Sequence, residues 1–182
     1  MNKTIKLHNL NFKTMIPAAE IESAVSRIAA QINQEYMGST TPPLLVGVLN
    51  GSFMFLSDLV KKLEFGCEVT FIKIASYSGT KSSGEVSELI GLNSSIQGRD
   101  LIVVEDIVDS GNSIEHTLNM LSGRGANSIK VCTLFFKPKA YTKTIKIDYK
   151  AFDIGNEFIV GYGLDYDQLG RNFKDIYVVC DE

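Results

Sequence analysis

The sequence is poor in cysteine and histidine, and this scarcity excludes several kinds of site. Its three cysteines, Cys67, Cys132 and Cys180, are odd in number and widely spaced, with no CxxC pair. They therefore fit neither a disulfide framework nor a zinc site, and they favour a reducing cytoplasmic location. The only two histidines, His8 and His116, are too few for a histidine-rich metal centre.

Long apolar runs and a strong charge bias are also missing. The most apolar stretch, residues 44–56, is interrupted by Asn50 and Ser52 and is too short to cross a bilayer. Lysines near the N-terminus separate short apolar pairs, so we expect no signal-peptide core. The 18 basic and 21 acidic residues give a net charge of −3. This balance argues against nucleic acid and against an anionic membrane as partners.

The residues that are present suffice for one hydrophobic core. Of the 182 residues, 45% are hydrophobic and 21% are charged, which is typical of an ordinary globular domain. We therefore predict that residues 1–182 form a single domain. The sequence has no fixed-period repeat and no heptads. A Gly- and Ser-rich stretch at 78–87 indicates a loop.

Apolar runs alternate with helical patterns along the chain. Helices are predicted from Pro17 to about Gly38, over 52–63 and over 110–121. Strands are predicted over 44–49, 68–75, 101–104, 129–136, 150–154 and 175–180. Strands that are apolar throughout are typical of a parallel sheet buried on both faces. The expected fold class is therefore α/β, a parallel sheet flanked by helices on both faces.

The most informative string covers residues 103–113, around the end of an apolar strand. Ligands of open parallel sheets bind beyond the carboxyl ends of the strands. Glu105 and Asp106 suit the hydroxyls of a sugar or Mg²⁺-bound water, whereas the amides at the following helix start suit a phosphate. Asp109 lies between these two halves. A lone Asp-Ser-Gly would more often be a simple helix cap, but here strand, acidic pair and cap are continuous. The chain lacks both GxGxxG and GxxxxGK[ST].

This string resembles the 5-phosphoribosyl-1-pyrophosphate motif of the purine phosphoribosyltransferases. From about residue 44 onward, the chain is similar to the hypoxanthine(-guanine) phosphoribosyltransferase family. The resemblance implies the type I phosphoribosyltransferase fold, with a small hood built from N-terminal residues and roughly residues 140–175. It also implies Mg²⁺ as cofactor and a homodimer or homotetramer. The implied activity is purine salvage, in which phosphoribosyl pyrophosphate and hypoxanthine, and also guanine, give the nucleotide and pyrophosphate.

The resemblance further assigns roles to residues in the first two thirds of the chain. Glu105 and Asp106 would contact the ribose, and Asp109 would be the general base or hydrogen-bond partner of the purine imidazole. The 5′-phosphate would be held by Ser110, Gly111, Asn112 and Ser113. The pyrophosphate loop, which has a cis peptide in the family, would be Leu49, Asn50 and Gly51. Many members carry Lys at the position of Asn50. Ser76 and Tyr77 would belong to a lid that excludes water.

Roles in the last third of the chain come from the same resemblance. Lys137 would donate to the purine 6-oxo group, Phe158 would stack on the base, and Ile159 would contact the base through backbone atoms. Asp165, together with Glu105 and Asp106, would bind Mg²⁺. Arg171 would contact the pyrophosphate, for which a guanidinium is well suited.

Several other functions stay open at this stage. One is a regulatory protein that senses phosphoribosyl pyrophosphate, although the net charge and length offer no basic face or added helix-turn-helix. Another is a phosphoribosyltransferase that prefers xanthine or adenine, and Lys137 argues against adenine because an ammonium only donates. A third is a flavodoxin-like or methyltransferase-like nucleotide binder, which would leave Lys137, Asp165 and Arg171 without a role.

Overall fold

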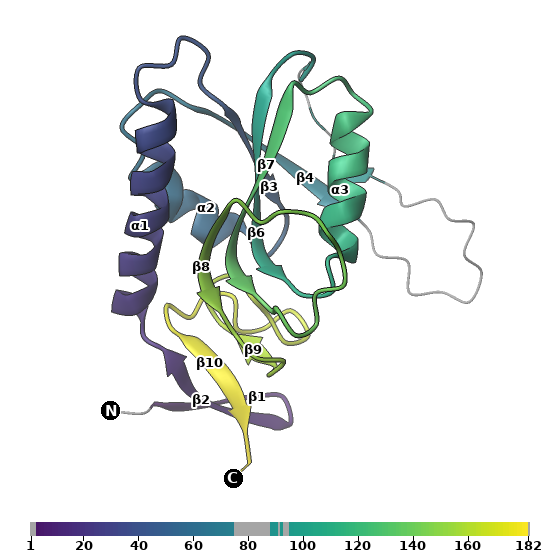
Figure 1. Ribbon diagram of the computed structural model, residues 1–182. Coiled ribbons are helices and arrows are strands. Elements are labelled where there is room, and N and C mark those ends of the chain that lie inside the picture. The colour runs from purple at the N-terminus through teal and green to yellow at the C-terminus, as the bar shows by residue number, and fades with distance from the viewer. Residues whose placement is uncertain (1–2, 75–87, 91, 93–94, 182) are drawn as a thin grey trace, which may run out of the picture.

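The computed structural model describes residues 3–74, 88–90, 92 and 95–181. Its main element is a six-stranded sheet with the order β5-β4-β3-β6-β7-β8 (Figure 1). The strands are β3 (Leu44–Val48), β4 (Glu68–Ile74), β5 (Glu88–Ile90), β6 (Asp100–Val108), β7 (Ser128–Phe136) and β8 (Tyr149–Asp153). All neighbours pair in parallel except β5, which pairs antiparallel with β4 at one edge. The predicted parallel sheet is therefore confirmed.

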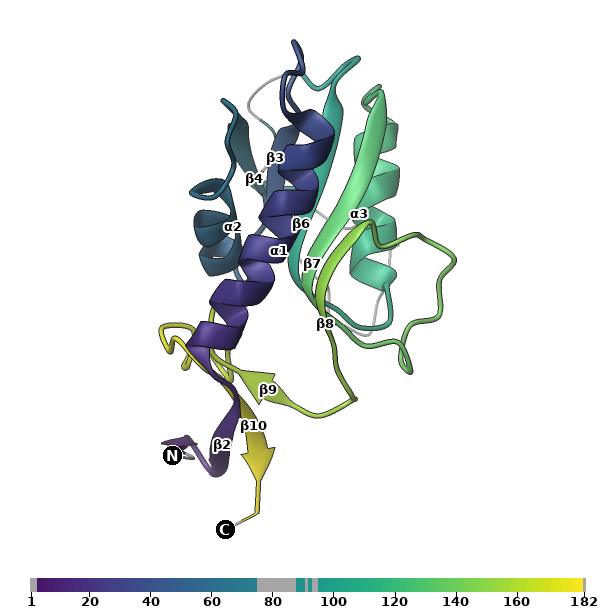
Figure 2. The same ribbon diagram turned by 60° about the vertical axis from the view of Figure 1, so that its left-hand side comes forward.

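Helices cover both faces of this sheet, as the sequence predicts. Helices α1 (Ala18–Tyr36) and α2 (Phe53–Val60) lie on one face, and α3 (Asn112–Ser122) lies on the other (Figure 2). The apolar side chains of α1 recur at helical spacing and are buried, as at Ile21, Val25 and Ile28. They join the larger of two apolar cores, whereas Ile114 of α3 belongs to the core on the opposite face.

A second, smaller sheet is antiparallel and has the order β1-β2-β10-β9. Its strands are β1 (Thr4–Leu7), β2 (Leu10–Ile16), β9 (Ile159–Val160) and β10 (Ile176–Cys180). Both ends of the chain thus meet in one sheet (Figure 1). The buried residues of the small sheet divide between two cores. Val160 and Tyr177 belong to a minor core with Leu7 and Phe12, while neighbouring residues of β9 and β10 join the main core.

The sequence patterns predict β10 but not β1, β2 or β9. In β1 and β2, apolar residues do alternate with polar ones such as Lys6 and Lys13, but each alternating run is too short to predict a strand by itself. Strand β2 is held by pairing with β10, which is distant in the sequence, and β1 pairs with β2. The expected hood, from N-terminal residues and roughly 140–175, overlaps this sheet in part, since β10 lies beyond residue 175. Its assignment as a hood stays a prediction.

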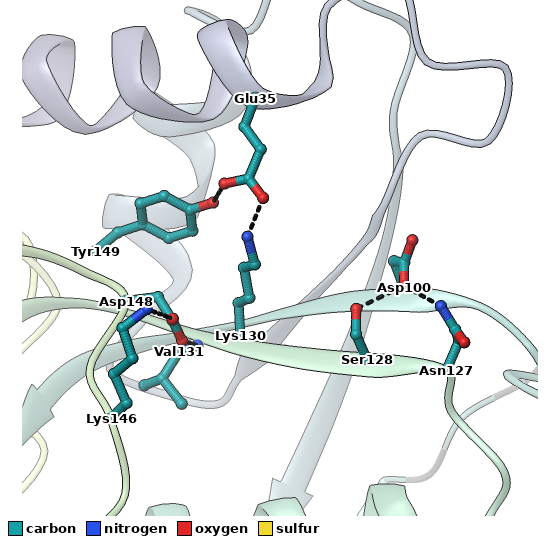
Figure 3. A network of polar contacts seen from close by, with 9 residues as sticks. All are labelled: Glu35, Asp100, Asn127, Ser128, Lys130, Val131, Lys146, Asp148 and Tyr149. Carbon is teal, nitrogen blue, oxygen red and sulfur yellow. Dashed lines mark hydrogen bonds and ion pairs between the residues drawn. The ribbon is translucent and has the colours of Figure 1, made fainter.

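A polar network ties α1 to the amino-terminal edge of the central sheet (Figure 3). The carboxylate of Glu35 accepts hydrogen bonds from Lys130 of β7 and Tyr149 of β8. Burial raises the pKa of Glu35, but these two donors outweigh burial and hold the pKa below its usual value. Nearby, Asp100 accepts hydrogen bonds from Asn127 and Ser128. This network stabilises the fold at the edge opposite to the predicted site.

No described helix is long and apolar enough to span a bilayer.

Candidate functional site

The two acidic residues of the central string lie within β6, not after it. The strand was predicted to end at Val104 but continues to Val108, because its pairing with β7 persists through Val108 and Phe136. Side chains of adjacent strand residues leave opposite faces of a sheet. Glu105 accordingly faces Ser113 on α3, whose hydroxyl donates to Glu105 Oε1 at 3.5 Å. Asp106 faces the loop that follows β3.

Both carboxyl groups titrate abnormally because of where they lie. Burial raises the pKa of Glu105 well above its usual value, and the neighbouring charge of Asp106 adds to this shift. Burial also raises the pKa of Asp106, to about 6. Hydrogen bonds from backbone amides and the charge of Arg171 oppose this rise, and the charge of Asp165 adds to it. Asp106 is thus electrostatically linked to residues from a distant part of the chain.

Residues 109–115, here called the phosphate loop, connect β6 to the first turn of α3. Gly111 has φ +89°, in the left-handed region that favours glycine. The first amides of α3 have no carbonyl partner within the helix, as at any helix start. A cavity of about 110 Å³ lies here, lined by Glu105, Ile107, Val108, Asp109, Ser110, Gly111, Ser113 and Ile114. Its backbone amides, serine hydroxyls and helix dipole suit an anion.

Lys137 follows β7 directly and lies beside Asp109. Its backbone amide donates to the carbonyl of Val108 at 3.0 Å, which aligns the ends of the two strands. The Lys137 ammonium, with only 9% of the residue exposed, lies 3.1 Å from Asp109 Oδ2. About half of the Asp109 side chain is exposed. The structure therefore brings together the two residues that were predicted to face the purine.

The loop after β3, residues 49–51, forms a second anchor point. The Leu49–Asn50 peptide is cis, as the resemblance predicts. Gly51 is buried against Asp106, and a Cβ at this position would lie 1.5 Å from Asp106 Oδ2. The absence of a side chain thus lets the carboxylate lie against the backbone of the loop. The side chain of Asn50 is exposed.

Residues 161–171, the connection between β9 and β10, lie against the loop after β3. A Cβ on Gly163 would lie 2.1 Å from the carbonyl oxygen of Gly51, so the two backbones are in direct contact. Arg171 Nη1 donates to the carbonyl of Gly163 at 2.8 Å, and Arg171 Nη2 lies 2.6 Å from Asp165 Oδ1. Arg171 and Asp165 are therefore both held beside the loop at 49–51.

Aromatic residues line the small sheet next to this connection. Phe158 directly precedes β9 and is 42% exposed, and its ring lies edge-on to Tyr166 with centroids 5.5 Å apart. Ile159 is buried in the main core, which leaves its backbone as the part that a ligand could reach. An exposed ring beside a buried neighbour is consistent with the roles predicted for this pair.

The predicted lid residues Ser76 and Tyr77 lie outside the described residues. Among the residues that are described, no three His, Cys, Asp or Glu side chains gather closely enough to hold a metal by themselves. Sequence reasoning did not single out Tyr162, whose hydroxyl donates to Asp58 of α2 at 2.6 Å and ties the 161–171 connection to α2. Its place between two glycines was the only signal.

Comparisons with known proteins agree with this architecture. The family described as "Phosphoribosyl transferase domain" matches residues 15–167. A hypoxanthine-guanine phosphoribosyltransferase of Streptococcus agalactiae is 41% identical over 171 residues, covering 93% of this chain and 94% of that protein. The bifunctional protein TilS/HprT of Listeria innocua is 38% identical over 97% of this chain, which spans only 27% of that longer protein.

A solved structure is similar to nearly the whole fold. The crystal structure of a hypoxanthine phosphoribosyltransferase from Staphylococcus aureus has a TM-score of 0.85 and 35% sequence identity. The match covers 92% of this chain and 90% of that one.

Proposed function

The chain belongs to the phosphoribosyltransferase family, and from this premise we propose that it is a purine salvage enzyme, a hypoxanthine(-guanine) phosphoribosyltransferase. It transfers the 5-phosphoribosyl group from phosphoribosyl pyrophosphate to N9 of hypoxanthine or guanine, giving the nucleotide and pyrophosphate. One observation carries this proposal. Two separate anion-binding regions flank the Asp109–Lys137 pair, and they match a substrate with a phosphate at one end and a pyrophosphate at the other.

The phosphate loop binds the 5′-phosphate. Backbone amides at the start of α3 and the hydroxyls of Ser110 and Ser113 surround a cavity that can take a single phosphate. Asn112 is the first residue of the helix and contributes its amide. Glu105 and Asp106, before the loop, orient the ribose through its hydroxyls, since carboxylates accept hydrogen bonds. Holding the sugar in one orientation removes much of the entropic cost of reaction.

The pyrophosphate lies between residues 49–51 and Arg171. The guanidinium of Arg171 is fixed by Asp165 and by the carbonyl of Gly163, so it is positioned before substrate arrives. The side chain of Asn50 is exposed but carries no charge. The positive charge at the pyrophosphate end of the site therefore comes from Arg171. Fixed positive charge where negative charge develops lowers the barrier to pyrophosphate departure.

Mg²⁺ fits the donor set at this end of the site. Asp106 and Asp165 supply hard carboxylate oxygens, and the charge of Asp165 helps to raise the pKa of Asp106. Glu105, which was also predicted to bind Mg²⁺, points toward α3 instead, so among the described residues Asp106 and Asp165 are the predicted metal-binding acids on this face. This suits an ion that keeps waters and takes further oxygens from the substrate. When bound, Mg²⁺ would neutralise part of the pyrophosphate charge.

The purine is read by Lys137 and Phe158. An ammonium can donate but not accept, so Lys137 selects a 6-oxo over a 6-amino group. One proton of Lys137 serves Asp109, which leaves others for the base. Phe158 offers its exposed ring for stacking, and the backbone of Ile159 contacts the base edge. In the reaction, purine N9 bonds to the anomeric carbon, the bond to pyrophosphate oxygen breaks with its electron pair, and Asp109 assists loss of the purine proton.

The proposal extends to the location and the assembly of the protein. The free thiols of Cys67, Cys132 and Cys180 fit a reducing compartment such as the cytoplasm. A homodimer or homotetramer is proposed from the family alone. The lid role of Ser76 and Tyr77 also stays a prediction.

A base-panel assay tests the proposed function directly. Pyrophosphate release is measured with hypoxanthine, guanine, xanthine or adenine, with phosphoribosyl pyrophosphate and Mg²⁺ present or omitted. We expect pyrophosphate release with hypoxanthine and with guanine, but not with xanthine or adenine. Release should require both phosphoribosyl pyrophosphate and Mg²⁺. Release with xanthine alone would replace the substrate assignment. No release with any base would contradict the enzyme and favour a regulatory protein that senses phosphoribosyl pyrophosphate.

A further inference from the structure

Residues 137–143, the segment that follows β7, run along the phosphate loop and contact it at several points. We call this segment the brace. It begins at Lys137, beside Asp109, and it reaches the first turn of α3 at Lys143. Backbone hydrogen bonds from Ala140 and Tyr141 to the Lys137 carbonyl form the turn that makes this path possible. The brace therefore spans the whole loop from base end to helix.

Ion pairs at both ends of the brace neutralise acids that flank the anion cavity. Lys137 Nζ lies 3.1 Å from Asp109 Oδ2, and Lys143 Nζ lies 2.7 Å from Glu115 Oε2. Asp109 and Glu115 stand just before and just after the phosphate-binding residues. Unpaired carboxylates at these places would repel a phosphate. Each lysine of the brace thus removes one obstacle to anion binding.

Thr142 holds the middle of the loop. Its backbone amide and its hydroxyl both donate to the carbonyl of Ser110, at 3.2 Å and 3.1 Å. Among the described residues, the one cis peptide is Leu49–Asn50, so the Ser110–Gly111 peptide is trans. In a trans peptide the carbonyl and the amide point in opposite directions. With its carbonyl drawn to Thr142, this peptide aims the Gly111 amide away from the brace, toward the cavity that Ser110 and Gly111 line.

Tyr141 fixes the distance between the brace and the loop. A Cβ on Gly111 would lie 2.6 Å from Tyr141 Cε2 and 2.7 Å from Lys143 Cγ, so the ring and the lysine stem lie directly on the glycine. The Tyr141 hydroxyl donates to the carbonyl of Ile145 at 2.7 Å, and its ring lies edge-on to Phe136 at 5.0 Å. The tyrosine is thus anchored on two sides, and the brace cannot slide along the loop without losing these contacts.

We propose that Thr142 and Lys143 are positioning residues for the 5′-phosphate of the substrate. Thr142 aims the Gly111 amide at the phosphate, and Lys143 cancels the charge of Glu115 beside it. This inference rests on the proposed function, because it takes the ligand of the phosphate loop to be a sugar 5-phosphate. Neither residue touches the reacting atoms, so their substitution changes substrate affinity more than turnover.

The first experiment removes the Thr142 hydroxyl and keeps its shape. For Thr142→Val, we expect the Kd of ribose 5-phosphate, measured by calorimetry, and the KM of phosphoribosyl pyrophosphate to rise about fivefold, the effect of one hydrogen bond. The Ki of pyrophosphate and kcat should change less than about twofold, since uniform binding is lost and not transition-state binding. Thr142→Ser should restore both values. Thr144→Val is the matched control, because Thr144 is exposed and makes no side-chain hydrogen bond among the described residues.

The second experiment separates charge from mechanical support at Lys143. Lys143→Met should raise the Kd of ribose 5-phosphate about threefold at low ionic strength and less at high salt. Adding Glu115→Gln to Lys143→Met should return the Kd to near the wild-type value, because the uncompensated carboxylate is gone. A merely structural ion pair would give no such rescue, since the pair is broken in both proteins.

Three results would overturn the inference. The first is an unchanged Kd of ribose 5-phosphate in Thr142→Val. The second is a loss of pyrophosphate binding in Thr142→Val as large as the loss of ribose 5-phosphate binding. The third is the absence of rescue of Lys143→Met by Glu115→Gln. Calorimetry does not depend on turnover, so the brace is judged even if the wild-type protein releases no pyrophosphate. That outcome would contradict the proposed function, whereas the role of the brace would still be tested by ribose 5-phosphate binding.

Discussion

The two regions that we propose to bind anions are built in opposite ways. The phosphate loop comes from one continuous stretch between β6 and α3, and it offers backbone amides, with Asp109 and Glu115 paired to lysines and Glu105 accepting from Ser113. The pyrophosphate region is assembled from the loop after β3, from Asp106 and from the connection between β9 and β10. It holds its acids on the ligand side and uses one arginine. In the first region two flanking acids are paired with lysines, whereas in the second the acids lie beside the arginine.

This difference matches the ligands that we propose for each region. A single phosphate can be satisfied by a helix start, which needs no counterion. A pyrophosphate that must leave with additional negative charge needs stronger compensation, and a hard cation held by carboxylates can provide it. Acids that would damage the first region are therefore useful in the second. The predictions below test this contrast.

The largest effect is expected at Asp109, the first residue of the phosphate loop, whose carboxylate is paired with Lys137. Asp109→Asn should lower kcat by about 10²- to 10⁴-fold, the range typical of acid–base groups. The KM of phosphoribosyl pyrophosphate should change little, because neither anion is bound by this carboxylate. Steady-state kinetics with hypoxanthine measures both values, and Asp153→Asn is an exposed control. A normal kcat would remove the role assigned to Asp109.

A smaller effect is expected at Arg171, on the pyrophosphate side. Arg171→Lys keeps the charge but loses the planar group that contacts both Asp165 and the Gly163 carbonyl. The Ki of pyrophosphate should rise about 10- to 100-fold, the cost of hydrogen bonds to charged groups. The Kd of ribose 5-phosphate should stay near the wild-type value. If both ligands weakened equally, the two regions would not be separable.

The Glu35 network at the opposite edge of the sheet should affect stability but not ligand binding. Glu35→Gln should lower the free energy of unfolding at pH 7 by about 1 kcal/mol, since Glu35 is partly exposed. The native pKa of Glu35 is lowered, so its contribution is present above the unfolded pKa and is lost as pH falls through the native pKa. Urea unfolding at pH 7 and pH 3.5 measures this loss, and the kinetic constants should be unchanged. A shift in the Kd of either anion would mean that this edge and the site are coupled.

The smallest effect is expected at Asn50. Asn50→Lys adds an exposed cation beside the pyrophosphate region. At low ionic strength the KM of phosphoribosyl pyrophosphate should fall about two- to threefold, and the gain should vanish at high salt. Asn156→Lys, at another exposed position, controls for net charge. An equal gain in ribose 5-phosphate affinity would show that the charge acts generally and not on one region.

Sequence patterns predict the phosphate side of the site better than the pyrophosphate side. Residues 109–113 are local, and a strand followed by small residues and a helix start is visible in the sequence. The end of β6 was nevertheless placed too early, because acidic residues seldom continue a strand, whereas pairing of Glu105 with Thr133 extends it. The roles assigned to these residues stay predictions.

Contacts between distant segments could not be predicted from patterns. Gly163 lies on Gly51, and Tyr162 bonds to Asp58, only because the small sheet docks at the carboxyl edge of the central sheet. Thr142 and Lys143 look like ordinary polar surface residues in the sequence. Their partners lie in a loop near 110, and only the tertiary fold brings the two segments together.

The division of the small sheet between two cores has a consequence for the substrate. Four residues of the small sheet and its connection belong to the main core, namely Ile16, Ile159, Tyr162 and Ile176. Exposing any one of these side chains to water would cost about 2 kcal/mol of folding free energy. The small sheet is therefore fixed to the central sheet, and the fixed separation of the two proposed anion-binding regions would select substrates by their length. A molecule that reaches both regions binds as a bivalent ligand, with the second contact made at high effective concentration. Fragments that fill one region each gain nothing from this fixed spacing.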